Sequence, residues 1–167
     1  MKRLLVLCIA LGGWMAAQQS KTIIIVRHAE KVSEAADAGL SPTGLKRAEC
    51  LAETLKDANV GAIYTSEVKR TQQTAEPLSK AQSLKPKVIP ARDEAKLVES
   101  VLKDTGKRVL IVSHSNLIPD IVKRLAAGEV PAMGANEYDR MILVTMTDGH
   151  AQSAVTLRYC NASPSAK

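Results

Sequence analysis

The sequence predicts an α/β fold: a three-layer α/β/α sandwich with a mostly parallel sheet and a C-terminal antiparallel hairpin. Two observations carry this prediction. The segments 22–26 and 108–113 each contain four consecutive apolar residues, 23–26 and 109–112, which is typical of strands buried on both faces of a parallel sheet. Segments with helical spacing of apolar residues alternate with strand-like segments up to residue 125, and this alternation favours parallel strands joined by helices.

The first half of the chain carries clear start and stop signals for its elements. Ser41 is a good N-cap and Pro42 a good first helical residue. Pro77 should interrupt or restart the helix in which it falls. The predicted elements are a helix from Ser41 to about Asp57, a strand at 62–65, a helix capped by Ser66, a weak strand at 87–90 and a helix at 93–103.

The second half begins with the buried strand 108–113 and a helix that Ser115 or Asn116 caps and that reaches Leu125. Residues 147–150, Thr-Asp-Gly-His, are a hairpin signal between two strand-like segments. Those segments are 141–146 and 153–159. No internal repeat and no linker divides the chain, so residues 19–167 are predicted to form one domain.

The composition excludes one class of partner. The 167 residues carry a formal net charge of +6, which suits an anionic ligand. No dense Lys/Arg run with interleaved aromatic residues is present, so no nucleic-acid partner is predicted. Because the chain contains no Phe, its core must be built from Leu, Ile, Val and Ala.

Residues 1–18 read as a secretory signal peptide. Lys2 and Arg3 form a positive start, and an apolar run from Leu4 to Ala17 follows. The alternative is an N-terminal membrane anchor, for which the run is short. The sequence therefore predicts a periplasmic or secreted protein with no stable membrane span after removal of the signal.

Two cysteines would remain in the mature chain, Cys50 and Cys160. In an oxidising compartment they could form a disulfide. They lie far apart in the sequence, and two buried free thiols are an equal alternative.

Charged side chains follow the two strongest strands. Arg27 and His28 end the first strand, His114 ends the strand 108–113, and Arg70 lies just after the strand 62–65. The carboxyl ends of parallel strands meet at one edge of a sheet, so these side chains can converge there. Two guanidinium groups and two imidazoles suit a phosphoryl group, because guanidinium forks hold its oxygens and an imidazole can attack phosphorus.

These residues belong to four linked motifs, through which the chain resembles the histidine phosphatase superfamily, the group that includes cofactor-dependent phosphoglycerate mutases. The motifs run in the order and at the spacing of that family and cover nearly the whole mature chain. They are Val26–Lys31, Leu40–Gly44 followed by Arg47 and Ala48, Tyr64–Ser66 with Arg70–Ala75, and Val112–Asn116.

The resemblance implies a role for each matching position. His28 is expected to be the nucleophile that becomes phosphohistidine, with Arg27, Arg70 and His114 holding the phosphoryl oxygens. For attack, His28 must be neutral, and a backbone carbonyl that accepts from its other nitrogen would fix the required tautomer. Ser115 and Asn116 could also reach the phosphate, although helix caps are the more ordinary role of such residues. Neither a metal nor another cofactor is expected.

The sequence offers several candidates for the residue that protonates the leaving group. The family often places an acid after the third strand, where Asp93 and Glu94 stand, and Glu94 is the preferred candidate. Acids in a first helical turn also stabilise the helix dipole. Glu30 is another candidate, unless it only pairs with Lys31. Small members of the family can lack an obvious acid when their leaving groups need less protonation.

The predicted function is a metal-independent phosphatase that hydrolyses phosphomonoesters or phosphohistidine through a covalent intermediate on His28. Its partner would be a phosphorylated small molecule, an envelope sugar phosphate or a phosphoprotein. One alternative is a non-catalytic anion-binding or interaction domain with a phosphatase-like fold. Another is a metal-dependent hydrolase that uses the histidines as ligands, but few carboxylates accompany His28 and His114.

Overall fold

The structure is a computed structural model, and it describes residues 19–160. The predicted signal peptide, residues 1–18, lies outside the described residues, as do residues 161–167. The elements in chain order are β1 Ser20–Arg27, α1 Pro42–Leu55, β2 Ala62–Thr65, α2 Lys69–Ala81, β3 Lys87–Val88, α3 Glu94–Lys103, β4 Arg108–Ser113, α4 Ile118–Arg124, β5 Arg140–Thr147 and β6 His150–Arg158.

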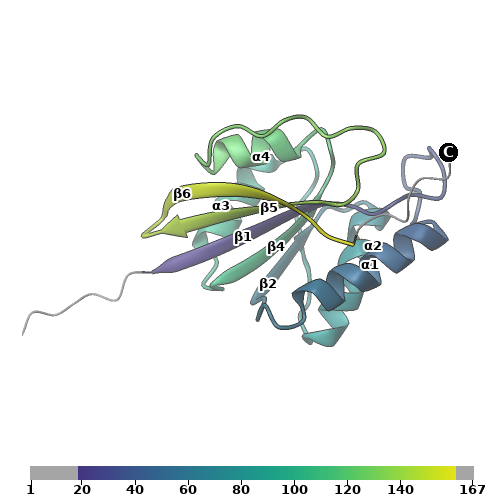
Figure 1. Cartoon of the computed structure of the whole chain (residues 1–167), viewed down its shortest axis with the longest axis horizontal. Coiled ribbons are helices and arrows are strands. Elements are labelled where there is room, and N and C mark those ends of the chain that lie inside the picture. Colours follow the sequence, from purple (N-terminus) through teal and green to yellow (C-terminus); the bar gives the residue numbers. More distant parts are fainter. Residues whose placement is uncertain (1–18, 161–167) are drawn as a thin grey trace, which may run out of the picture.

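One six-stranded sheet organises the molecule, in the order β3-β2-β4-β1-β5-β6. The strands β3, β2, β4 and β1 are parallel, and β5 and β6 add an antiparallel hairpin at one edge. Helices cover both faces (Figure 1). The predicted α/β fold with a mostly parallel sheet and a C-terminal hairpin is confirmed.

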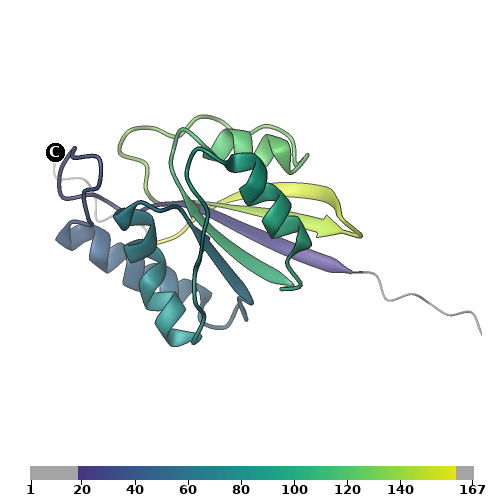
Figure 2. The ribbon, with the colours of Figure 1, turned by 180° about the vertical axis from the view of Figure 1, so that it is seen from behind.

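Alternation along β1 divides the core into two layers. Ile23 and Ile25 pack on the same face as α3 and α4, whereas Ile24 and Val26 pack on the face of α1 and α2. In Figure 2 the sheet is seen from behind, with α3 on the near side. Because β1 is apolar on both faces, it is fixed in the middle of the sheet, and its carboxyl end is held rigidly.

The strand β3 is shorter than the predicted 87–90. Only Lys87 and Val88 pair with β2, and both are exposed. Proline has no N–H to give to a ladder, so Pro86 and Pro90 confine the strand to this edge. The backbone N–H of Ile89 still donates to the carbonyl oxygen of Thr65 at 3.0 Å.

The C-terminal hairpin turns more tightly than the four-residue signal suggested. β5 and β6 are joined by Asp148 and Gly149 alone, both with positive φ (49° and 81°). This is the backbone of a two-residue turn of the kind that favours Asp-Gly. His150 is the first residue of β6 and is exposed.

Two predictions about α2 are wrong. Pro77 does not interrupt the helix, which runs from Lys69 to Ala81 with the proline inside it. The residues on either side of it, Ala75 and Leu78, are fully buried against the sheet, and this packing offsets the missing hydrogen bond. Ser66 is not the N-cap either: that position is Val68, and the Ser66 side chain lies in a buried hydrogen-bond chain described below.

The predicted cap of α4 is also wrong. The helix begins at Ile118, its N-cap is Leu117, and no side chain caps it. The carbonyl oxygen of His114 accepts from the N–H groups of both Leu117 and Ile118, which turns the chain into the helix without Ser115 or Asn116.

The structure pairs Cys50 with Cys160 in a disulfide, with 6.1 Å between their α-carbons. This bond ties α1 to the end of β6 and decides between the two alternatives that the sequence left open. Within residues 19–160, no helix is both long and apolar enough to cross a lipid bilayer.

Candidate active site

The carboxyl ends of three neighbouring parallel strands meet at one edge of the sheet. His28 follows β1, Ser66 follows β2 and His114 follows β4. Arg27 stands opposite Ser113 in the ladder, and the N–H of His28 donates to the Ser113 carbonyl oxygen at 2.9 Å. The two imidazole rings lie edge to face with centroids 5.3 Å apart. The sheet thus brings together the two histidines that the sequence singled out.

His28 has the tautomer that a nucleophile needs. Its ring is 4% exposed, and Nδ1 lies 2.8 Å from the carbonyl oxygen of Ala29. A carbonyl can only accept, so Nδ1 carries the proton and Nε2 keeps its lone pair. Burial and, to a smaller extent, the charges of Arg70 and Arg27 together lower the pKa of His28 to about 3, although the hydrogen bond to Ala29 opposes the shift. The imidazole is therefore neutral at physiological pH.

The guanidinium group of Arg27 is hydrogen-bonded through Nη1, whereas its Nε has no hydrogen-bond partner among the described residues. Nη1 donates to three carbonyl oxygens of the loop before β5, and the ring of Tyr138 lies 4.0 Å from Cζ. These carbonyl groups belong to Gly134, Ala135 and Glu137. Nε is buried and has no partner among the described residues. Burial lowers the pKa of Arg27 from its ordinary value.

Arg70 repeats this pattern from the other side of the site. Its Nη1 donates to the carbonyl oxygen of Ala36 at 2.7 Å, and Nη2 lies 3.4 Å from Nδ1 of His114. Its Nε is buried and, within residues 19–160, has no partner. A buried donor without a partner costs free energy, so two of them beside His28 indicate that an anion completes the site.

His114 is held between a cation and a hydroxyl group. Nδ1 faces Arg70, and Nε2 lies 3.0 Å from Oγ of Ser66. Burial and, to a smaller extent, the charge of Arg70 together lower its pKa to about 4, although the charge of Glu67 opposes the shift. His114 is thus neutral in the free site, and the positive charge there comes from the two guanidinium groups.

Glu30, one candidate for the acid, has a structural contact instead. Both of its carboxylate oxygens accept from Arg47, at 2.6–3.0 Å. The start of α1 lies directly on its backbone: the N–H of Ser41 donates to the Glu30 carbonyl oxygen, and a Cβ on Gly44 would lie 2.2 Å from that oxygen. Glu30 therefore fixes α1 against the loop that carries His28.

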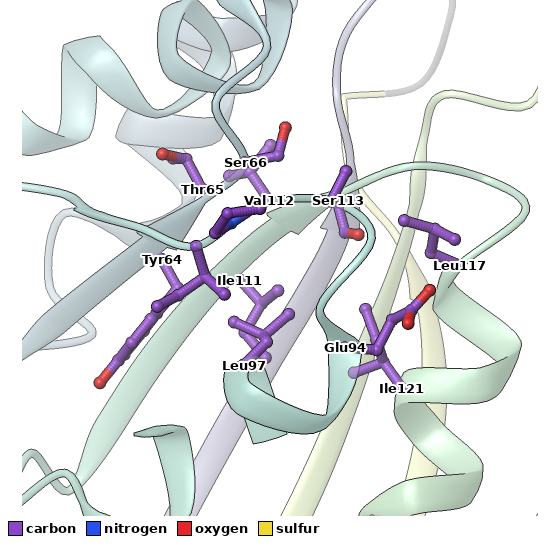
Figure 3. A pocket seen from close by; sticks show the side chains of 13 residues that line it. Tyr64, Thr65, Ser66, Glu94, Leu97, Ile111, Val112, Ser113, Leu117 and Ile121 are labelled. Atoms are coloured by element: carbon purple, nitrogen blue, oxygen red, sulfur yellow. The ribbon is translucent and has the colours of Figure 1, made fainter. Parts of the chain in front are cut away.

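Asp93 and Glu94 differ in their surroundings. The Asp93 carboxylate accepts from the N–H of Lys96 and is the N-cap of α3. Glu94 lines a small cavity beneath the site, together with Ser66 and Ser113 (Figure 3). The free volume is about 10 Å³, close to the least that holds one water molecule. Within residues 19–160, Glu94 makes no hydrogen bond to either histidine.

Ser115 and Asn116 lie in the turn after His114, where Ser115 is half-buried and Asn116 exposed. Among the described residues, neither side chain hydrogen-bonds to Arg27, His28 or Arg70. Their part in phosphate binding stays a prediction.

Three residues of the site escaped the sequence. Ser66 contacts His114, Thr71 contacts Ser66 at 2.9 Å, and Tyr138 lies 6.2 Å from His28 between ring centroids. The position of Ser66 was a usable signal, because it ends a parallel strand as His28 and His114 do. Tyr138 gave none, since the loop that carries it has no repeating pattern.

No cluster of three or more His, Cys, Asp or Glu side chains suited to a metal ion occurs among residues 19–160. The site is built from the donors of two guanidinium groups and from two imidazoles, rather than from carboxylates. Donors of this kind bind anions and not cations.

Comparison with known proteins gives a consistent picture of fold. The protein histidine phosphatase SixA, solved with tungstate, is 23% identical, covers 85% of this chain and 99% of its own, and has a TM-score of 0.68. A mycobacterial glucosyl-3-phosphoglycerate phosphatase is 19% identical, covers 86% of this chain and 100% of its own, and has a TM-score of 0.61. A protein described as mycobacterial hydrolase 2 is 14% identical, covers 87% of this chain and 94% of its own, and has a TM-score of 0.66. At these identities the likeness establishes the shared fold.

No curated protein matches the sequence significantly. A sequence model of the histidine phosphatase superfamily (branch 1) does match, over residues 23–100. That stretch contains Arg27, His28 and Arg70, whereas His114 lies beyond it. Over residues 23–100 the chain is thus similar to the histidine phosphatase superfamily (branch 1), and it shares its fold with solved phosphatases over most of its length.

Proposed function

We propose that this protein is a phosphatase that hydrolyses phosphomonoesters or phosphohistidine through a covalent phosphohistidine intermediate on His28. One observation carries the proposal: a neutral His28 with a free Nε2 lies beside two buried guanidinium Nε–H groups that lack partners among residues 19–160. The names of the related structures, SixA and the glucosyl-3-phosphoglycerate phosphatase, support the same reaction class.

The reaction takes two steps. The lone pair of His28 Nε2 forms a bond to phosphorus while the bond from phosphorus to the leaving group breaks, a P–O bond in a phosphomonoester or a P–N bond in phosphohistidine. The free N–H groups of Arg27 and Arg70 donate to the phosphoryl oxygens as their charge changes. Water then attacks the phosphohistidine, releases inorganic phosphate and returns the electron pair to Nε2. Throughout, the Ala29 carbonyl oxygen keeps the proton on Nδ1.

The test compares His28→Ala with His150→Ala, since His150 is an exposed histidine on β6. The wild type should hydrolyse p-nitrophenyl phosphate and trap acid-labile phosphate. The H28A variant should do neither, while H150A should behave as the wild type. A wild type without turnover or trapped phosphate would instead favour the non-catalytic anion-binding domain.

Glu94 is the acid that we propose for alkyl leaving groups. Its place in the cavity under Ser66 and Ser113 supports this, and the contacts of Glu30 and Asp93 give those carboxylates other roles. An aryl leaving group needs little protonation, whereas an alkoxide needs a proton. Glu94→Gln should therefore slow hydrolysis of a sugar phosphate about 10²-fold or more and spare p-nitrophenyl phosphate.

The matched control is Glu67→Gln, because Glu67 also lies near His114 but its carboxylate accepts from the N–H of Ala91 at 2.7 Å. Selective loss in E67Q rather than in E94Q would assign the proton to Glu67 and overturn the proposal for Glu94.

We also propose that the protein is exported to the periplasm or secreted, and that its substrate is a phosphorylated small molecule, an envelope sugar phosphate or a phosphoprotein. The disulfide supports export, since such bonds persist in oxidising compartments. The full chain, expressed in a bacterial host, should be recovered from the periplasm or medium without residues 1–18. Recovery of the intact chain from the cytoplasm with reduced thiols would contradict this.

A further inference from the structure

The hydrogen bonds around His114 have a direction that can be read from their two ends. At one end, Nη2 of Arg70 lies 3.4 Å from Nδ1 of His114, and a guanidinium group can only donate. Nδ1 must therefore accept, so the proton of the neutral ring is on Nε2. The structure thus gives His114 the opposite tautomer to that of His28.

At the other end, Oγ1 of Thr71 donates to the carbonyl oxygen of Val68 at 2.8 Å or to that of Ser66 at 3.2 Å. A carbonyl can only accept, so the single hydrogen of the Thr71 hydroxyl is donated to the backbone and is not available to Ser66. The 2.9 Å contact between Ser66 and Thr71 must then run from the Ser66 hydroxyl to Thr71. Ser66 Oγ is left to accept from Nε2–H of His114 at 3.0 Å.

All three residues of this series of hydrogen bonds are buried away from water. Ser66 is 5% exposed, Thr71 0% and His114 6%. In Figure 3 the Ser66 hydroxyl points away from the small cavity that Glu94 also lines. No solvent molecule can readily replace a missing partner in such a place, so reversing one link costs a buried hydrogen bond.

The tautomer matters because the two nitrogens face different surroundings. Nε2 points to Ser66, whereas Nδ1 points to Arg70, whose buried Nε–H has no partner within the described residues. An anion bound to the guanidinium group of Arg70 therefore approaches the Nδ1 side of His114, because Nε2 is taken by Ser66. In the free protein the lone pair of that nitrogen accepts from Arg70, so Nδ1 has no hydrogen to donate to an anion.

We propose that Ser66 and Thr71 are positioning residues that hold His114 as the Nε2–H tautomer, so that an anion in the site can bind only when His114 takes up one proton at Nδ1. The imidazolium then donates from Nε2 to Ser66 and from Nδ1 to the anion. This inference deepens the proposed function, on which it rests for the location of the anion.

The groups that face His114 leave it as the residue that takes up the proton. Arg70 and Arg27 carry fixed positive charge, and His28 already donates its single proton to Ala29. Glu67, from the loop between β2 and α2, acts on His114 only through its charge. The dianion supplies the negative charge that makes imidazolium favourable.

The first test reads the tautomer directly in the free protein. Long-range ¹H–¹⁵N NMR spectra of histidine-labelled protein distinguish Nε2–H from Nδ1–H, and His150→Asn assists assignment. We expect Nε2–H for His114 and Nδ1–H for His28. An Nδ1–H signal for His114 would overturn the proposal.

The second test measures proton linkage with tungstate, which stays a dianion between pH 6 and 9. The wild-type Kd should rise about tenfold per pH unit, as uptake of one proton requires. Ser66→Ala removes the acceptor at Nε2, so the ring can place its proton on Nδ1 and the slope should fall towards zero. Thr71→Val frees the Ser66 hydroxyl to donate to Nε2 and should have the same effect.

Ser153→Ala, an exposed serine on β6, should keep the wild-type slope. If S66A does not fold, T71V and the NMR measurement carry the test. Slopes in S66A and T71V equal to that of the wild type would overturn the coupling and leave the phosphatase intact. A wild type that binds no tungstate would overturn the anion site and the coupling together.

Discussion

The two ends of the sheet bury polar groups in opposite ways. At the carboxyl end, Arg27 and Arg70 each keep a buried Nε–H without a partner among residues 19–160. At the amino end, a comparable set of buried polar atoms is fully paired. Unpaired buried donors at the carboxyl end are available to a ligand, whereas the paired groups at the amino end stabilise the folded protein.

The amino end closes on the carboxylate of Asp104, whose side chain is 5% exposed. Its Oδ2 accepts from Tyr64 at 2.8 Å and Lys87 at 2.5 Å, and its Oδ1 accepts from the N–H of Gly106 at 2.8 Å. Burial alone would raise the pKa of Asp104, but these hydrogen bonds prevail and lower it. Nζ of Lys21 donates to three carbonyl oxygens at the end of α3, and this caps the helix.

The difference indicates where substitutions should affect activity and where they should affect stability. A group with all its partners contributes to folding, and its loss exposes those partners. A group held without a partner contributes little to folding and is retained for a ligand. The two ends should therefore respond oppositely to the loss of one charged side chain.

The largest effect is expected from Arg70→Ala at the carboxyl end. Loss of one preorganised donor should lower kcat/KM for p-nitrophenyl phosphate by roughly 10²- to 10³-fold. The free energy of unfolding should change by less than about 1 kcal/mol, because the substitution also removes an unsatisfied donor. Enzyme kinetics and urea unfolding measure the two quantities. Arg108→Ala, an exposed arginine at the amino end, is the control and should change neither.

Asp104→Ala should give the reverse result. The variant loses hydrogen bonds to a charged group and leaves the N–H of Gly106 without a partner, which should lower the free energy of unfolding by about 2 to 3 kcal/mol. Because Asp104 lies at the far end of the sheet, kcat/KM should stay within about twofold of the wild type. Asp57→Ala, at an exposed acid, serves as the control. A large loss of activity in D104A at full stability would break the comparison.

The contrast between the ends also marks what the sequence could predict. The convergence of Arg27, His28 and His114 was predictable because Arg27 ends a buried parallel strand and each histidine directly follows one. Arg70 lies shortly after a third such strand, β2. The disulfide was not, since 110 residues separate Cys50 from Cys160 and only the fold brings them together. The roles of Glu30 and Ser66 were missed for the same reason: their partners, Arg47 and His114, come from other elements.

Local signals also failed where tertiary contacts overrode them. Pro77 should break a helix, but the buried side chains of Ala75 and Leu78 keep α2 continuous. Ser115 and Asn116 are good capping residues, but the carbonyl group of His114 already turns the chain. Both errors concern helix boundaries, which packing against the sheet decides.

Acid should reveal the buried neutral histidines. The pKa values of His28 and His114 are lowered to about 3 and about 4, so between these values and about 6.5 the unfolded chain binds more protons than the native protein. Stability therefore rises with pH through this window and is lost as pH falls. Each histidine should cost about 1 to 2 kcal/mol at pH 5 relative to pH 7.5.

Urea unfolding at the two pH values measures this loss, and His114→Gln should reduce it by the contribution of one histidine. Asp104 and Glu137, whose pKa values are lowered, contribute only at more acidic pH. If the loss between pH 7.5 and 5 stayed unchanged in both H114Q and His28→Asn, it would have to arise outside the site, and the carboxyl end would no longer differ from the amino end in this respect.

The smallest effect on activity is expected from substitution of Tyr138, whose ring stacks on the Arg27 guanidinium group and makes no hydrogen bond to it. Three carbonyl oxygens already hold the Arg27 guanidinium group, so the ring adds only a cation–π contact of about 0.5 to 1 kcal/mol. Tyr138→Ala should lower kcat/KM about two- to fivefold, and Tyr138→Phe should leave it unchanged, because the ring and not the hydroxyl makes the contact. Equal losses in both variants would instead assign a role in the reaction to the phenolic hydroxyl.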